Sequence, residues 1–83
     1  MTTGETVLEA IREHLAGRGI DAAKVVPEAD LLKDLDLDSL DTMELTLGLE
    51  ERFGIEIPDQ ELEGLATVAD AVGLVERKVS VGA

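Results

Sequence analysis

Ser39 is the side chain of this sequence that is best placed to do chemistry. It lies in the segment Asp34-Leu35-Asp36-Leu37-Asp38-Ser39-Leu40-Asp41, at the expected start of a helix. The first backbone N–H groups of a helix have no partner within it, and together with the helix dipole they favour a negatively charged group. A phosphodiester on Ser39 would meet that favourable helix end. The surrounding acids oppose the added charge, so a partner enzyme and a metal ion would be needed to install it.

The same residues also have a plain structural interpretation. Asp38 can be an N-cap, Asp41 can complete the cap, and Ser39 can be an inert residue of the first turn. Because serine after aspartate is common at helix starts, the local pattern leaves both interpretations open.

Other kinds of catalytic chemistry find little support in the sequence. There is no cysteine, which excludes disulfides, thiolate zinc sites and cysteine nucleophiles. The single histidine, His14, is far from Ser39 in the sequence, and we expect it to be a solvated helix residue. There is no glycine-rich phosphate loop and no histidine cluster with the spacing of metal ligands. We therefore expect a protein that is not an enzyme.

The charge of the chain is strongly acidic and unevenly spread. The 83 residues, enough for one domain, carry a net charge of −12. Between Glu28 and Glu63 there are 13 acids, opposed by Lys33 and Arg52 alone. Such a chain repels nucleic acid and anionic membranes and attracts partners that present Lys and Arg.

The sequence shows neither a signal peptide nor a membrane span. The start, Met1-Thr2-Thr3-Gly4-Glu5, lacks the pattern of a signal peptide, and no apolar run is long enough to span a membrane. We expect a soluble, cytoplasmic, monomeric protein that stands alone rather than a piece of a larger synthase.

The spacing of apolar residues predicts an all-α fold, a small four-helix bundle with three longer helices and one short one. The expected helices are 5–16, 38 or 39 to 53, 59–64 (capped by Asp59) and 67–78. A long loop, 20–37, follows the first helix. Its apolar residues, Leu31 and Leu32 among them, should hold it on the core, and a helical turn near 29–33 is expected. The whole chain, 1–83, forms a single domain, ordered over about 5–79, with a frayed tail at 80–83.

The second helix carries two apolar stripes. At 100° per residue, Leu45, Leu49 and Phe53 fall on one side, and Leu40, Met43 and Leu47 fall on roughly the opposite side. One stripe can face the core of a small bundle. The other, flanked by Glu44, Glu50 and Glu51, then forms a docking surface. The alternative is a central helix with both stripes buried.

The wider pattern closely resembles the acyl carrier protein family. The resemblance rests on four motifs and covers nearly the whole chain. They are Asp38-Ser39-Leu40-Asp41-Thr42 followed by Glu44-Leu45, then Leu49-Glu50-Glu51-Arg52-Phe53, Glu56-Ile57-Pro58-Asp59, and Thr67-Val68. The resemblance implies the four-helix fold of acyl carriers.

It also implies a covalent cofactor and a set of enzyme partners. Ser39 would be esterified with 4′-phosphopantetheine by a 4′-phosphopantetheinyl transferase that uses coenzyme A, and Asp38 would help the transferase, with magnesium, to recognise the site. The arm's thiol would carry acyl groups as thioesters in fatty-acid or polyketide-type biosynthesis. Further partners would be acyltransferases, a ketosynthase and reductases that present basic patches.

The resemblance assigns two further groups of residues. The partner-binding residues are Leu40, Asp41, Met43, Glu44, Leu47, Glu50, Glu51, Glu56 and Asp59. The candidates to line an acyl pocket between the second and third helices are Leu49, Phe53, Ile57, Leu62 and Leu65, all of which can also be plain core. Gly48, which costs about 1 kcal/mol relative to Ala in a helix interior, is expected to open space near that pocket.

The sequence departs from the family pattern at two positions. Leu37 and Leu62 stand where the family often has small residues. We expect the first to alter the surface beside the arm and the second to alter the pocket. Leu37-Asp38-Ser39 favours an acyl over a peptidyl or other carrier.

Two rival interpretations from other classes stay open. Asp34, Asp36 and Asp38 match the first, third and fifth positions of a calcium-binding EF-hand loop, but Ser39 and Leu45 fail at the sixth and twelfth. The chain can also be an acidic protein-interaction module, weakly binding divalent cations, whose Ser39 carries no arm.

Overall fold

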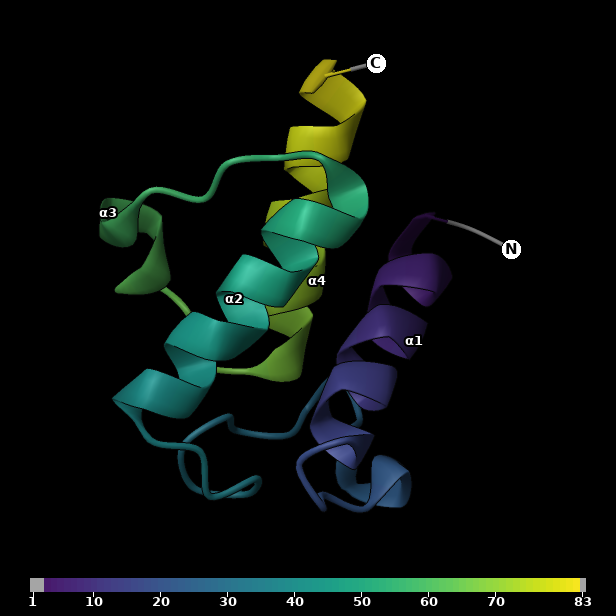
Figure 1. Cartoon of the computed structure of the whole chain (residues 1–83), viewed down its shortest axis with the longest axis vertical. Coiled ribbons are helices and arrows are strands. Elements are labelled where there is room, and N and C mark those ends of the chain that lie inside the picture. The colour runs from purple at the N-terminus through teal and green to yellow at the C-terminus, as the bar shows by residue number, and fades with distance from the viewer. Residues whose placement is uncertain (1–2, 83) are drawn as a thin grey trace.

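The computed structural model describes residues 3–82, and the side chains of residues 3–79. The elements in this part of the chain are α1 (Thr3–Ala16), a short 3-10 helix η1 (Ala22–Lys24), α2 (Ser39–Phe53), α3 (Asp59–Leu62) and α4 (Val68–Gly82). In Figure 1, α2 runs in front of α4, α1 lies to one side of them, and the short α3 lies on the other side. The predicted all-α fold is confirmed, because these residues form no strand and only an isolated bridge between Asp30 and Thr67.

Local capping sets the bounds of α2. The Asp38 side chain accepts a hydrogen bond from the Asp41 backbone N–H (2.8 Å), and the Asp41 side chain accepts one from the Asp38 N–H (3.3 Å). This reciprocal pair satisfies two donors that the helix itself leaves open. The helix ends at Gly54, which takes the left-handed conformation (φ 64°) that glycine adopts without strain.

A second reciprocal cap begins α4. The Thr67 N–H donates to Asp70 Oδ2 (3.0 Å), and the Asp70 N–H donates to Thr67 Oγ1 (3.2 Å). The helix continues to Gly82, beyond the end near Lys78 that the sequence suggests. We expected the tail, residues 80–83, to fray. Its last residue, Ala83, lies outside the described residues.

The short helix α3 differs from the prediction at both ends. Pro58 is its N-cap, extended and without a side-chain cap, and the helix ends at Leu62 rather than Gly64. Because the extended residue is Pro58, Asp59 becomes the first helical residue and the prediction that it caps the helix is wrong.

The hydrophobic core lies between α1, α2, α4 and the long loop. Its members are at most 6% exposed: Val7, Ala10, Ile11 and Leu15 from α1, Leu45 and Leu49 from α2, Val68, Ala71, Leu74 and Val75 from α4, Ile57 from the connector, and Val25, Ala29, Leu31, Leu35 and Leu37 from the loop. Two expectations fail here. Leu32, which we expected on the core, is 55% exposed, and Leu37, which we expected at the surface, is buried.

Backbone hydrogen bonds attach the loop to the start of α4. The Leu31 N–H donates to the Ala66 carbonyl, and the Val68 N–H donates to the Ala29 carbonyl, both at 2.9 Å. The expected helical turn near 29–33 is present as a single turn. The Asp34 N–H closes it by donating a hydrogen bond to the Asp30 carbonyl. Asp36 then takes a left-handed conformation (φ 55°) that redirects the chain into α2.

Candidate functional site

Ser39 is the first residue of α2, and it is exposed. The residue before it, Asp38, already places a carboxylate at this helix end. The hydrogen bond from the Asp41 backbone N–H, more than any other contact, lowers the pKa of Asp38 below its usual value. The helix end therefore stabilises a negative charge, as the sequence predicts, and it does so directly beside the serine.

A hollow opens next to Ser39. It has a volume of about 390 Å³, and most of the residues that line it together with the serine are apolar. The lining residues are Leu31, Leu32, Ser39, Thr42, Met43, Asp59, Leu62, Glu63 and Leu65. Two of the five predicted acyl-pocket residues, Leu62 and Leu65, lie in this hollow.

The remaining predicted pocket residues lie elsewhere. Leu49, Ile57 and also Leu65 line an enclosed void between α2 and α4. Its volume is about 10 Å³, at the lower limit for one water molecule. Phe53 packs half-buried against the core and lines neither space. The interior is closed in this conformation, so a chain that enters it must displace side chains.

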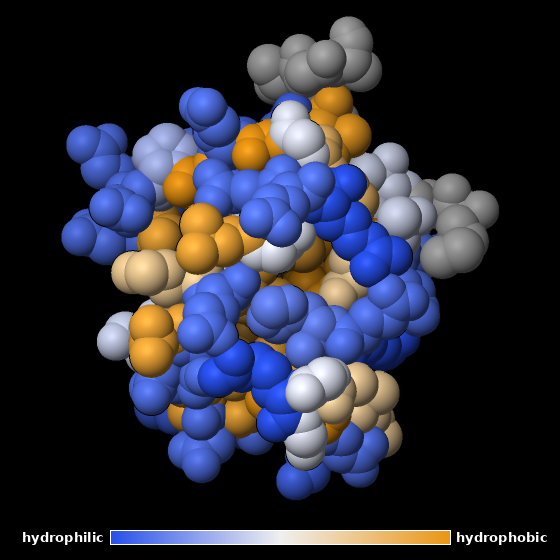
Figure 2. Space-filling model, viewed as in Figure 1, coloured by the Kyte–Doolittle hydropathy of each residue, from blue (hydrophilic) through white to orange (hydrophobic). Residues whose placement is uncertain are grey.

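The two stripes of α2 have opposite environments. Leu45 and Leu49 are 2% and 4% exposed, whereas Leu40, Met43 and Leu47 are 60%, 48% and 53% exposed. The alternative with both stripes buried is therefore wrong. Figure 2 shows hydrophobic groups scattered among hydrophilic ones on the face over which α2 runs. Leu32, from the loop, is a further exposed hydrophobic residue that also lines the hollow beside Ser39.

The predicted acidic residues are not equally available. Glu51, Glu56 and Asp59 are exposed. Glu50 is half-buried, and its Oε2 accepts a hydrogen bond from the Ile57 N–H (2.8 Å), which ties α2 to the connector before α3. Glu50 therefore has a structural role that sequence reasoning missed.

Asp41 and Glu44 have a partner within the chain that sequence reasoning also missed. Both carboxylates form ion pairs with the guanidinium of Arg18, from the turn after α1. Nothing in the sequence indicates this contact, since Arg18 precedes its partners by 23 and 26 residues.

The predictions for Gly48 and His14 are both wrong, because the two residues lie against each other. A Cβ atom at Gly48 would lie 3.1 Å from His14 Nδ1, so the glycine faces α1 and not the predicted pocket. Its small size allows α1 and α2 to approach closely. His14 is half-buried, not solvated, and its Nε2 is buried without a hydrogen-bond partner in the described structure.

The calcium-binding alternative finds no support in the geometry. Asp34 Oδ2 accepts a hydrogen bond from the Asp30 N–H (2.7 Å), and Asp38 caps α2. Within residues 3–82, no three His, Cys, Asp or Glu side chains gather to hold a metal ion.

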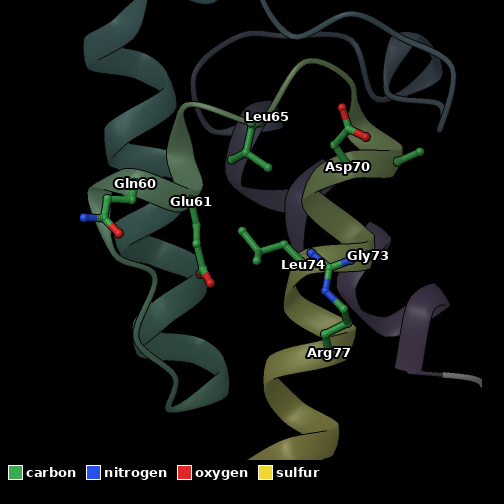
Figure 3. A pocket seen from close by; sticks show the side chains of 9 residues that line it. Gln60, Glu61, Leu65, Asp70, Gly73, Leu74 and Arg77 are labelled. Carbon is green, nitrogen blue, oxygen red and sulfur yellow. The ribbon is translucent and has the colours of Figure 1, made fainter.

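A separate pocket of about 320 Å³ lies between α3 and α4 (Figure 3). Leu65 and Leu74 contribute its apolar part, and Glu61, Asp70 and Arg77 contribute charges of both signs. Ser39 does not line this pocket, so the hollow beside the serine is the candidate site.

None of the described helices has the length and apolar character needed to cross a membrane.

Comparisons with known proteins agree with this site. Residues 7–75 match the model of a family described as "Phosphopantetheine attachment site". An acyl carrier protein from Thermosynechococcus vestitus is 47% identical over 75 residues, which cover 89% of this chain and 93% of that protein. A crystal structure of an acyl carrier protein from Thermotoga maritima, 24% identical, has the same fold, with a TM-score of 0.89 over 100% of this chain and 98% of the other.

The chain therefore belongs to the family of proteins with a phosphopantetheine attachment site. Its role is that of an acyl carrier protein, which holds acyl groups on a covalently attached 4′-phosphopantetheine and is not itself an enzyme. As such it works with a phosphopantetheinyl transferase and with biosynthetic enzymes.

Proposed function

We propose that Ser39 carries the 4′-phosphopantetheine arm and that the exposed side of α2 is the surface on which partner enzymes dock. One observation supports both assignments. The exposed serine begins the same helix that presents Leu40, Met43 and Leu47 to solvent. An enzyme that binds along this stripe therefore meets the attachment point at its end.

The residues around Ser39 fit such an arm. The hydroxyl is on an exposed residue, the helix end favours a phosphodiester, and the neighbouring hollow offers Leu31, Leu62 and Leu65 to the apolar parts of a bound group. When bound, the arm supplies the thiol that holds an acyl group, which no side chain of this cysteine-free chain can supply.

The residues of the chain itself position the site and attract the partners. Asp38 and Asp41 fix the first turn of α2 and so the direction of Ser39. The acids along the surface, Asp41, Glu44, Glu51, Glu56 and Asp59, attract Lys and Arg of the transferase, acyltransferases, ketosynthase and reductases. Such docking is weak and sensitive to salt, because exposed charges are screened over about 8 Å at physiological ionic strength. A tether then raises the effective concentration of its cargo at each docked enzyme.

We place this activity in fatty-acid or polyketide-type biosynthesis in the cytoplasm. The acyl carrier protein from Thermosynechococcus vestitus and the sequence Leu37-Asp38-Ser39 support an acyl rather than a peptidyl cargo.

The assignment of Ser39 is tested by intact-protein mass spectrometry after incubation with coenzyme A, magnesium and a broad-specificity phosphopantetheinyl transferase. The wild type should gain one phosphopantetheine, and Ser39→Ala should gain none while keeping its helical circular dichroism spectrum. Ser80→Ala, at the only other serine, is the matched control and should be modified like the wild type. If Ser39→Ala still gains the group, another residue bears the arm.

A further inference from the structure

Arg18 occupies part of the surface that we assign to partner enzymes. Its two terminal guanidinium nitrogens contact one carboxylate each, Nη2 with Asp41 Oδ1 and Nη1 with Glu44 Oε2. The two acids are one helical turn apart on α2, so a single planar guanidinium spans both.

A well-formed turn delivers Arg18 to this place. The Arg18 N–H and the Ile20 N–H both donate to the Leu15 carbonyl at 3.0 Å, and the Gly19 N–H donates to the Ala16 carbonyl at 3.0 Å. Gly19 takes a left-handed conformation (φ 87°). The backbone position of Arg18 is therefore defined by α1, and only its side chain has to move for the contact to open.

The two acids that Arg18 binds lie among the exposed apolar residues of α2. Residues three or four apart share a helix face, so Glu44 lies beside Leu40 and Leu47, and Asp41 lies one turn before Glu44. A cationic side chain of an enzyme that packs on this stripe would meet the same carboxylates. The Arg18 side chain is 36% exposed, so both ion pairs are in contact with solvent, where such pairs contribute about 0–1 kcal/mol each.

We propose that Arg18 is an internal competitor for the docking surface, holding Asp41 and Glu44 until the Arg or Lys of a basic partner replaces it. The proposal rests on the proposed docking role of α2. Arg18 thereby weakens association with basic partners and sets a threshold of cationic charge that a partner must exceed.

A purely structural role for Arg18 predicts the opposite effect. If the residue only supports the capped start of α2, then its removal loosens the helix that carries Ser39, and docking becomes weaker or stays unchanged. If Arg18 competes with partners, its removal frees two carboxylates and docking becomes tighter.

The test uses the unmodified chain as the substrate of a phosphopantetheinyl transferase, with saturating coenzyme A and magnesium. KM for the chain is measured for the wild type, Arg18→Gln, Glu44→Gln and the variant that carries both substitutions. The matched control is Arg52→Gln. Arg52 lies in the last turn of α2 and forms an ion pair with Glu13, so this substitution removes the same charge at a different place. Thermal unfolding of each variant checks the fold.

We expect Arg18→Gln to lower KM about three- to tenfold, in line with the modest strength of exposed ion pairs, and Arg52→Gln to change it less than twofold. Glu44→Gln should raise KM, and by a larger factor when Arg18 is also Gln, because the competitor is then absent. The gain from Arg18→Gln should shrink at high salt.

Two outcomes overturn the proposal in distinguishable ways. If Arg18→Gln leaves KM unchanged or raises it while Glu44→Gln still raises it, the docking surface stands and the competition is refuted. If Glu44→Gln has no effect in either background, the docking surface itself is wrong and the competition falls with it.

Discussion

Leu45 and Leu47 form a matched pair for separating the two sides of α2. They have the same chemistry and lie two residues apart on one helix, but Leu45 is 2% exposed and Leu47 is 53% exposed. Truncation of each to Ala removes the same atoms. The two effects should therefore differ in kind, since one site belongs to the core and the other to the proposed docking surface.

The expected loss of stability follows from burial. Removing a buried leucine side chain costs about 2–5 kcal/mol. In a domain of this size each kcal/mol of lost stability lowers Tm by about 4–8 °C, so Leu45→Ala should lower Tm by at least about 8 °C. An exposed substitution costs about 0.5 kcal/mol or less, so Leu47→Ala should lower Tm by no more than about 4 °C.

The expected effect on docking has the opposite order. Leu47→Ala should raise the KM of the transferase for the chain roughly fivefold, since contact residues of this kind contribute about 1 kcal/mol. Leu45→Ala, measured well below its lowered Tm, should keep a nearly unchanged KM. Circular dichroism melts and transferase kinetics on the same samples give both quantities. A loss of stability in Leu47→Ala equal to that in Leu45→Ala, or an unchanged KM in Leu47→Ala, would refute the two-sided description of α2.

Two further predictions concern the backbone before α2 and the caps. Asp36 has a left-handed conformation, so Asp36→Gly should be neutral or stabilising, whereas Asp36→Val should cost about 1–2 kcal/mol in urea denaturation; equal effects would contradict the strain argument. Backbone hydrogen bonds lower the pKa of Asp38 and of Asp70, so their contribution to stability is complete above about pH 4 and is lost as the pH falls through the lowered pKa values. Tm should accordingly fall below pH 4 in the wild type and fall less steeply in Asp70→Asn, and parallel curves for the two proteins would argue against the cap.

The features that the sequence predicts well are those that depend on neighbours along the chain. A capping box joins residues three positions apart, so the cap formed by Asp38 and Asp41 is visible as a local pattern. The two-sided character of α2 follows from helical periodicity, which determines that Leu45 and Leu47 face different directions.

The features that the sequence misses depend on how distant segments pack. Leu31 and Leu32 are adjacent in an irregular turn, which has no helical or strand periodicity from which the buried one could be predicted. Gly48 lies against His14 of α1, a neighbour that is distant in the sequence. Arg18 contacts acids of α2 that are more than 20 residues away in the sequence. Charge alone does not indicate which of the many acids an arginine will pair with.

Asp41 shows how one side chain can serve two purposes without conflict. Its Oδ2 accepts the hydrogen bond from the Asp38 N–H, and its Oδ1 faces a cation. Because the oxygens are separate, one cation can be exchanged for another at Oδ1 while the bond at Oδ2 stays in place. If a partner's cation replaces Arg18 as proposed, the helix start at Ser39 keeps its shape while that partner binds and leaves.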